Sequence, residues 1–227
     1  MKALKQLLLL GICCISFNVF AVSRITETEM KVQFTAAPNY KIVNGFNVTS
    51  TYNKWLVINL SYKMPKQTSK IKSKPYAFID NPYIKWEILT YLLVGNKPTL
   101  GVVTGRTNYW SIAVDGKVHK ALAVVPPIIM QRYFVYEGKN VLAALNKTIF
   151  IRATLYNSEG KSLAVWYSSN EGMRKSAKKT NTKAVFNKID NNEDAAKIKG
   201  GIYPKNRSAW SFINIQEYDL IKEEEVQ

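Results

Sequence analysis

Alternation of apolar and polar residues at a period of two constrains the fold of this chain most. Residues 54–64 show it best, because apolar side chains fall on one face and mostly polar ones on the other. Residues 29–36, 83–94 and 147–156 repeat the pattern. The inward positions of 54–64 and 147–156 are Leu56, Ile58, Leu60, Tyr62, Ile149, Ile151, Ala153 and Leu155. The outward positions of 147–156 include Arg152, Thr154 and Tyr156. This periodicity predicts half-buried β-strands.

Two turn sequences separate such segments. Residues 157–160, Asn-Ser-Glu-Gly, lie between 147–156 and 161–168, and Asp115-Gly116 lies between 109–114 and 118–125. Glycine in these positions supplies the positive φ that a tight turn needs, so each turn predicts a hairpin. Pro126-Pro127 ends the second run because proline donates no ladder hydrogen bond.

Seven or eight short strands with little helix indicate an all-β sandwich, with Trp86 as a candidate core anchor. Residues 65–82 form a long, Lys-rich loop between strands. Residues 170–200 are basic, with apolar spacing that permits one or two short helices, and residues 210–221 are apolar enough to return to the body. The expected organisation is a domain over 22–169 and a basic, partly helical C-terminal extension over 170–227 that docks back on it.

The N-terminus has the anatomy of a secretory signal. Lys2 and Lys5 precede the apolar run 7–20, and Val19-Phe20-Ala21 fits the cleavage site. The alternatives are an uncleaved anchor, although the run is short for a span, and lipidation at Cys13. Cleavage after Ala21 predicts an exported protein of the periplasm or cell surface, with no stable transmembrane segment. Both cysteines leave with the signal, so the mature chain has no disulfide and no thiol chemistry.

The charge balance is strongly basic. The formal net charge is +16, and loss of the two signal lysines lowers it to +14. Such an excess favours contact with polyanions, including nucleic acid, acidic glycans and anionic membrane faces. A bias toward Lys and Asn in the genome explains it equally well.

Residues able to support catalysis are few. His119 is the single histidine, in a predicted strand and without a Gly-x-Ser-x-Gly elbow, which indicates a structural role. One histidine does not make a zinc site, and the Asp190, Glu193 and Asp194 group lacks the glycine of a calcium loop. We therefore predict no enzyme, no metal and no cofactor. Glycoside cleavage stays open, because Asp80, Glu87, Asp115 and Glu137 are carboxylates that the sequence cannot place.

Binding has more candidates. Lysines alternate with other residues before Tyr76 in the 65–82 loop, and a second basic cluster lies in 170–200. Lysine and arginine neutralise phosphates and sulfates, and aromatic faces stack on bases or sugars. The candidate polyanion-binding residues are Lys70, Lys72, Lys74, Arg174, Lys175, Lys178 and Lys179.

Several segments together resemble a known family. They are 105–110 (Gly-Arg-Thr-Asn-Tyr-Trp), 119–121 (His-Lys-Ala), 126–133, 149–165 with its Gly turn, and the closing run that starts at Pro204-Lys205. The chain is similar there to the immunoglobulin-like, pilus-associated proteins of Verrucomicrobia and their relatives. It departs at Ser208-Ala209-Trp210, where that family tends to carry Thr-Pro-Phe.

The resemblance implies an immunoglobulin-like antiparallel β-sandwich in a periplasmic or surface protein encoded with type IV pilus machinery, and no catalytic residues. Three hypotheses follow. The first is a non-enzymatic bacterial protein that contacts other pilus or envelope proteins. The second is a module that binds polyanions or acidic glycans, and the third is a glycoside-active enzyme.

Overall fold

The computed structural model describes residues 24–35, 54–70, 73, 75–95, 97–134, 149–169, 182–192, 195–211 and 218–222. The expected signal, residues 1–21, lies outside these residues. No helix in the described part of the chain is both long enough and apolar enough to span a bilayer.

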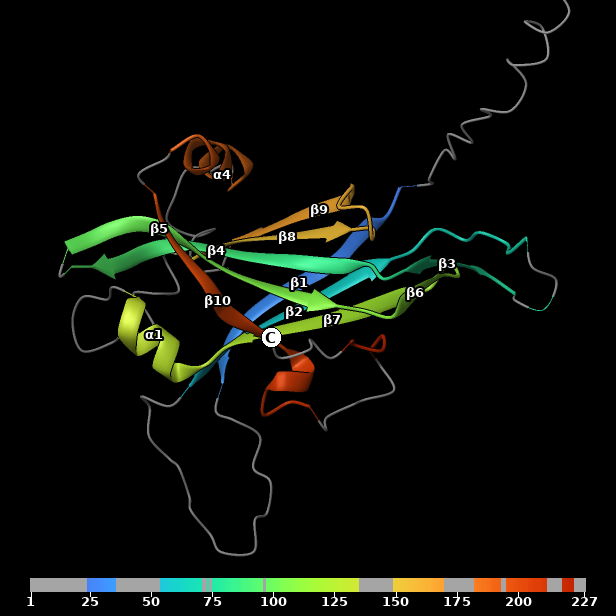
Figure 1. The fold of residues 1–227 in the computed structure, drawn as a ribbon, viewed down its shortest axis with the longest axis horizontal. Helices are drawn as coiled ribbons and strands as arrows, with labels where there is room; N and C mark the ends of the chain where they lie inside the picture. The colour runs from blue at the N-terminus through green and yellow to red at the C-terminus, as the bar shows by residue number, and fades with distance from the viewer. Residues whose placement is uncertain are drawn as a thin grey trace, which may run out of the picture.

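Eight strands form one continuous sheet. Its strands, in spatial order, are β1 (Thr26–Thr35), β2 (Trp55–Lys63), β7 (Val118–Val125), β10 (Ala196–Pro204), β5 (Lys97–Asn108), β4 (Tyr83–Val94), β8 (Phe150–Tyr156) and β9 (Ser162–Ser169). A two-stranded sheet pairs β3 (Ala77–Asp80) with β6 (Ser111–Val114). The helices are α1 (Pro127–Tyr133), α4 (Thr182–Asp190) and the 3-10 turn η2 (Lys205–Arg207). Figure 1 shows β4 and β5 as the longest pair.

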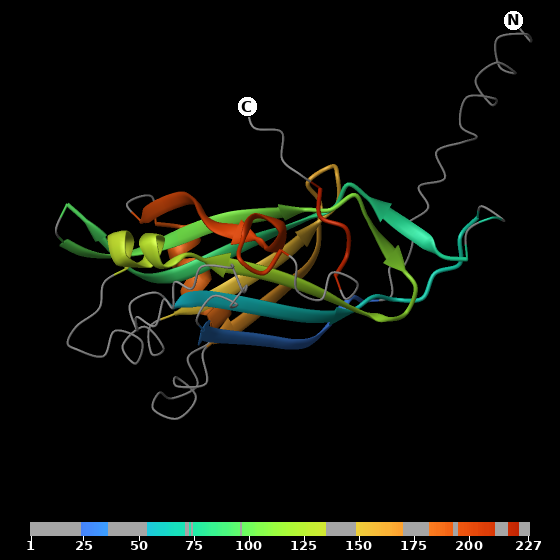
Figure 2. The same cartoon turned by 90° about the horizontal axis from the view of Figure 1, so that it is seen from below.

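The sheet folds over on itself and makes its own second layer. In the view from below, blue β1 and cyan β2 lie on one side of the core and green β4 and β5 on the other (Figure 2). The outermost strands β1 and β9 contact each other, and the ring centroids of Tyr62 and Trp166 lie 5.1 Å apart across the interior. The structure is therefore a mostly antiparallel, sandwich-like and barrel-like sheet, and the prediction of an all-β sandwich is confirmed.

The alternation of the sequence fills the core as predicted. Leu56, Ile58 and Leu60 of β2 are almost fully buried in the main apolar cluster. Trp86 of β4 is fully buried, and its indole Nε1 donates a 2.9 Å hydrogen bond to Oγ1 of Thr107. Trp86 is thus a core anchor whose polar atom is satisfied inside the protein.

One expected hairpin forms and the other does not. β8 and β9 pair around residues 157–160, where Gly160 has φ of 79°. Gly116 also has positive φ, but β6 pairs with β3 while β7 pairs with β2, so the hairpin predicted around Asp115-Gly116 is wrong. The reason is that the chain near Pro65 runs beside the turn, and its carbonyl accepts the Gly116 N–H at 3.2 Å.

Strand β10 lies inside the sheet, a place that the sequence did not predict. Its first part runs parallel to β5, and its last two residues pair antiparallel with β7. Two extra residues between Ile198 and Ile202 form a bulge where Gly200 has φ of 73°. The placement differs from the expected extension, because part of 170–227 completes the sheet and does not only cover it.

Two other C-terminal elements pack against the sheet. Helix α4, inside the stretch expected to hold short helices, packs Phe186 and Ile189 against Leu89 and Val102 on the outer face of the sheet. Trp210 packs against β2 and β7, in a cluster that includes Leu122. The long loop predicted over 65–82 also contains β3, which the sequence did not indicate.

Candidate functional site

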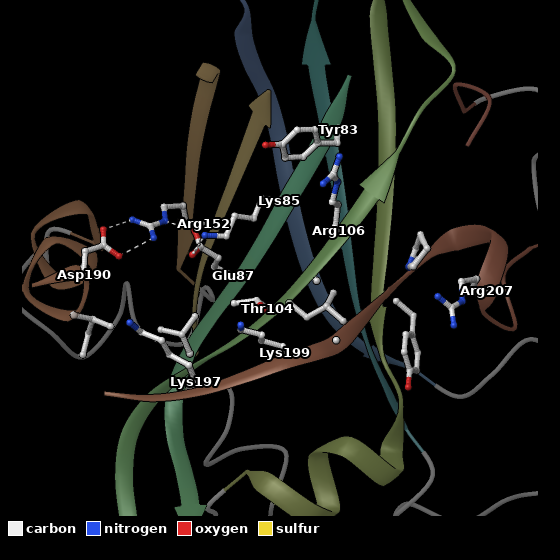
Figure 3. Close-up of a pocket in the computed structure, with 17 residues that line it drawn as sticks. Tyr83, Lys85, Glu87, Thr104, Arg106, Arg152, Asp190, Lys197, Lys199 and Arg207 are labelled. Atoms are coloured by element: carbon white, nitrogen blue, oxygen red, sulfur yellow. Dashed lines mark hydrogen bonds and ion pairs between the residues drawn. The ribbon is translucent and has the colours of Figure 1, made fainter. Parts of the chain in front are cut away.

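A groove of about 850 Å³ lies on the outer face of the sheet. Its floor is made of β4, β5 and β8, with α4 on one side and β10 on the other (Figure 3). Strand alternation explains the floor, since Ile84, Trp86 and Ile88 point into the core and the residues between them point outward. Six basic and two acidic side chains line the groove, a formal balance of +4: Lys85, Arg106, Arg152, Lys197, Lys199, Arg207, Glu87 and Asp190.

Arg152 of β8 holds both carboxylates of the groove. Its Nη1 and Nη2 atoms lie 2.6 and 2.9 Å from the two Asp190 oxygens, and its Nε donates to Glu87. Lys85 contacts the other oxygen of Glu87 at 2.8 Å. The hydrogen bonds from Arg152 lower the pKa of Asp190, despite the opposing effect of burial. This network fastens α4 to the sheet by a bidentate charge-assisted pair.

Arg106 of β5 is held in place by neighbours that leave its charge available. Its guanidinium carbon lies 3.6 Å from the centroid of the Tyr83 ring, and its Nε donates to Oδ1 of Asn108 at 2.5 Å. The other neighbour of Tyr83 is Tyr156, with stacked rings 4.8 Å apart and 14° between their planes. No ion pair within the described residues includes Arg106, so its fork is a fixed, unneutralised cation at the surface.

The β10 wall carries two further cations, Lys197 and Lys199. Both side chains are exposed, and neither takes part in an ion pair within the described residues. Lys199 lies in the β10 bulge, next to Gly200, which has the positive φ that glycine tolerates. The bulge thus forms part of the rim of the groove.

A second hollow, of about 290 Å³, adjoins the groove over β8 and β9. The two hollows share the four residues of the charge network, Lys85, Glu87, Arg152 and Asp190. The second hollow is mostly polar: besides the shared charged residues it is lined by Thr154, Ser162, Tyr156 and Tyr167, and Val165, which is 42% exposed, is its one aliphatic side chain. The groove and a smaller polar hollow are therefore joined across one ion-pair network.

The predicted polyanion-binding residues are mostly untested. Lys70 is exposed in the loop before β3 and does not line the groove. The other six lie outside the described residues: Lys72, Lys74, Arg174, Lys175, Lys178 and Lys179. They stay a prediction.

His119 lies in β7 and is held between two carboxylates. Its Nδ1 is 3.0 Å from the oxygens of Asp219, and its Nε2 is 3.1 Å from Oδ1 of Asp115. Burial opposes the charged ring, but the hydrogen bonds and charges of these carboxylates outweigh it and raise the pKa of His119. Only 9% of the side chain is exposed. Both ring nitrogens of His119 therefore have carboxylate partners, and its structural role stays a prediction.

Of the carboxylates considered for glycoside cleavage, Glu87 lines the groove, and Asp115 binds Nε2 of His119. Glu87 and Asp190 share the groove, but Arg152 lies between them and keeps the Asp190 carboxyl ionised. A glycosidase needs one carboxylic acid with a raised pKa. No group of three or more histidine, cysteine or acidic side chains in the described part is placed to hold a metal ion. Glu137, Glu193 and Asp194 lie outside it.

The sequence identified Arg152, Lys85 and Glu87 as outward-facing positions but did not join them into a site. It missed Arg106, because β5 carries glycines that interrupt the strand pattern, and it counted Lys199 only as part of the basic cluster in 170–200. The available signal was the alternation of Thr104, Arg106 and Asn108, whose side chains share one face of β5.

Comparisons with known proteins support the fold alone. No protein-family model and no curated protein matches the chain. A crystal structure of a protein from Akkermansia muciniphila is similar over 89% of this chain and 94% of that one, with a TM-score of 0.58 and 13% sequence identity. At that identity the likeness speaks for a shared architecture, and the groove must be interpreted from its own residues.

Proposed function

We propose that this chain is a non-enzymatic, exported bacterial protein that contacts other proteins of a type IV pilus or another cell-envelope assembly. The observation that carries the proposal is the open groove on the outer face of the sheet, with its formal balance of +4. A concave, charged surface on a rigid sheet is suited to holding a partner of opposite charge.

The state of the charged groups supports binding over catalysis. Arg152 pairs with both groove carboxylates, and Lys85 also pairs with Glu87. Neither carboxylate is therefore free to take up or release a proton as a general acid or base does. His119 is held by two carboxylates, and 9% of its side chain is exposed. The residues at the groove can orient a ligand by charge, and nothing in their arrangement requires a reaction.

The test is capture of partners in the native envelope. The full chain, tagged at its C-terminus, is expressed in a piliated bacterium, crosslinked in intact cells and purified under denaturing conditions. We expect crosslinked pilus or secretion-machinery proteins, and the mature N-terminus at Val22 by mass spectrometry. Recovery of the chain without any envelope protein would contradict the proposal.

A second candidate function is binding of polyanions or acidic glycans, which the excess of basic residues in the groove favours. Such binding is recognised by its dependence on salt, because release of counterions makes the affinity fall steeply with ionic strength. Heparin affinity is compared for the wild type, a variant with Lys70, Lys72 and Lys74 changed to Gln, and a variant with Arg106 and Lys199 changed to Gln. A loss in the first variant places the site in the 65–82 loop, and a loss in the second places it in the groove.

A further inference from the structure

We infer that the free protein holds its own acidic segment, Glu223-Glu224-Glu225, at the Arg106 end of the groove, with Glu224 against Arg106. The acidic segment lies outside the described residues, and Lys222 is the last described residue before it. The inference goes beyond the proposed function, because it concerns the protein before any partner binds. A partner of the groove must then displace this segment.

Backbone pairing brings the acidic segment to Arg106. The N–H of Lys222 donates to the Asn108 carbonyl at 2.8 Å, and the residue before Lys222 forms an antiparallel bridge with the residue after Asn108. Residue numbers run in opposite directions along an antiparallel pair, so Glu224, two residues after Lys222, comes level with Arg106, two residues before Asn108. Two residues span at most about 7 Å, which keeps Glu224 within reach of this position.

The side chains of Glu224 and Arg106 belong to the same face of the sheet. Arg106 lines the groove on the outer face, and Trp110, four residues later, is 56% exposed. Nζ of Lys222 lies 4.8 Å from the centroid of the Trp110 ring, so Lys222 is also on the outer face. Alternation gives that face to Glu224, two residues later. Opposite charges on directly opposed residues of one face attract each other.

The acidic segment cannot continue along β5 inside the sheet. The next strand position is occupied, because Gly105 pairs with Ile202 of β10. The core side is closed as well, since Glu223 would come level with Thr107, which is fully buried, and an unpaired carboxylate is costly to bury. The chain therefore leaves the sheet after Lys222 on the outer face, where the groove lies.

Charge complementarity selects this occupant for the groove. The acidic segment is the one run of three consecutive acidic residues in the sequence. Arg106, Lys197 and Lys199 line the groove and form no ion pair within the described residues. The Tyr83 ring and the Asn108 side chain also hold Arg106 in place. A carboxylate tethered two residues from an anchored backbone meets this cation at a high effective concentration, which a free anion must overcome.

The first experiment follows the glutamate carboxyl groups of the purified full chain by carbon-13 NMR during a pH titration at low salt. A nearby arginine favours the ionised carboxylate, so the titration midpoint of Glu224 should be about 1 pH unit lower in the wild type than in Arg106→Gln. Lys161→Gln removes an exposed cation outside the groove and should leave the midpoint unchanged. Equal midpoints in the wild type and in Arg106→Gln would overturn the inference.

The second experiment measures competition for the groove with a fluorescent pentaglutamate peptide. If the acidic segment fills the groove in two thirds of the molecules, changing its three glutamates to Gln should strengthen peptide binding about threefold. The control removes the same charge from exposed positions outside the groove, by changing Glu27, Glu29 and Glu159 to Gln, and should alter the affinity far less. Equal affinities of these two variants, or no binding of the peptide to either, would contradict the inference.

A second copy of the chain is the alternative occupant. If the acidic segment lies in the groove of its own chain, the titration midpoint of Glu224 does not change when the protein is diluted. A midpoint that moves toward the Arg106→Gln value on dilution would place the segment in a neighbouring copy and overturn the inference. The proposed function is tested separately, because capture of an envelope protein does not require the groove to be filled by this segment beforehand.

Discussion

His119 and Asp219 are 100 residues apart in the sequence, yet Nδ1 of the histidine lies 3.0 Å from the carboxylate of the aspartate. Asp115 binds the other ring nitrogen, and the hydroxyl of Tyr62 donates to Asp219 at 3.3 Å. The segment 218–222 is further fixed by the Lys222 N–H, which donates to the Asn108 carbonyl at 2.8 Å. A protonated His119 thus joins the C-terminal segment to the start of β7.

This arrangement predicts a stability that depends on pH. The folded pKa of His119 is raised above its ordinary value of 6.5, so its contribution is complete below pH 6.5 and disappears as the pH rises through the folded pKa. We expect the free energy of unfolding in urea to decrease between pH 6 and the alkaline side of that pKa. His119→Gln should cost about 1.5–3 kcal/mol at pH 6, the range for hydrogen bonds to charged groups. It should also flatten the dependence on pH over this interval, and an unchanged slope would refute the assignment.

Two buried tyrosines offer a matched comparison of hydroxyl groups. Tyr62 and Tyr109 are both almost fully buried, but only the Tyr62 hydroxyl has a hydrogen-bond partner among the described residues. Tyr62→Phe should cost about 1 kcal/mol, and Tyr109→Phe should be neutral or stabilising by up to about 1 kcal/mol, because it removes an unsatisfied buried polar atom. Thermal unfolding of both variants measures the difference. Equal destabilisation would mean that the Tyr109 hydroxyl has a partner.

Gly105 allows β10 and β5 to approach each other closely. A Cβ atom at this position would lie 2.2 Å from the Ile202 carbonyl oxygen, which belongs to the backbone and cannot move away easily. Gly105→Ala should therefore destabilise the protein by about 1–3 kcal/mol, the range for overpacking. Thr104→Ala, at the adjacent position with its side chain in the groove, is the control and should cost less. Urea unfolding compares the two, and a stable Gly105→Ala variant would mean that β10 can shift.

The sequence predicted the β2, β4 and β8 strands and the β8–β9 hairpin because their alternation is regular and their turn has a glycine with positive φ. It did not predict β10 or its pairing with β5. These strands approach closely through Gly101 and Gly105, and glycine at such contacts reads as a break in a strand pattern.

The groove was predictable only in part for the same reason. Lys85, Glu87 and Arg152 are outward positions of strands that the sequence indicated. Arg106 and Lys199 come from β5 and β10, and their neighbourhood depends on a parallel pairing between segments about a hundred residues apart. No local pattern encodes such a pairing, because it depends on which strand the fold leaves unpaired.

The network around Arg152 gives the last prediction. The Glu87 side chain is 7% exposed, and Arg152 is its main partner besides Lys85. Arg152→Met should destabilise the protein by about 3 kcal/mol or more, because it leaves buried Glu87 and its neighbour Asp190 without the shared cation. Adding Glu87→Gln to Arg152→Met should restore part of the loss, since the remaining side chain is neutral, and the double-mutant cycle measures the coupling. Lys31→Met, which breaks the exposed Lys31–Glu29 pair, is the control and should stay within about 0.5 kcal/mol of the wild type. Additive effects of the two groove substitutions would show that Glu87 and Arg152 are not coupled.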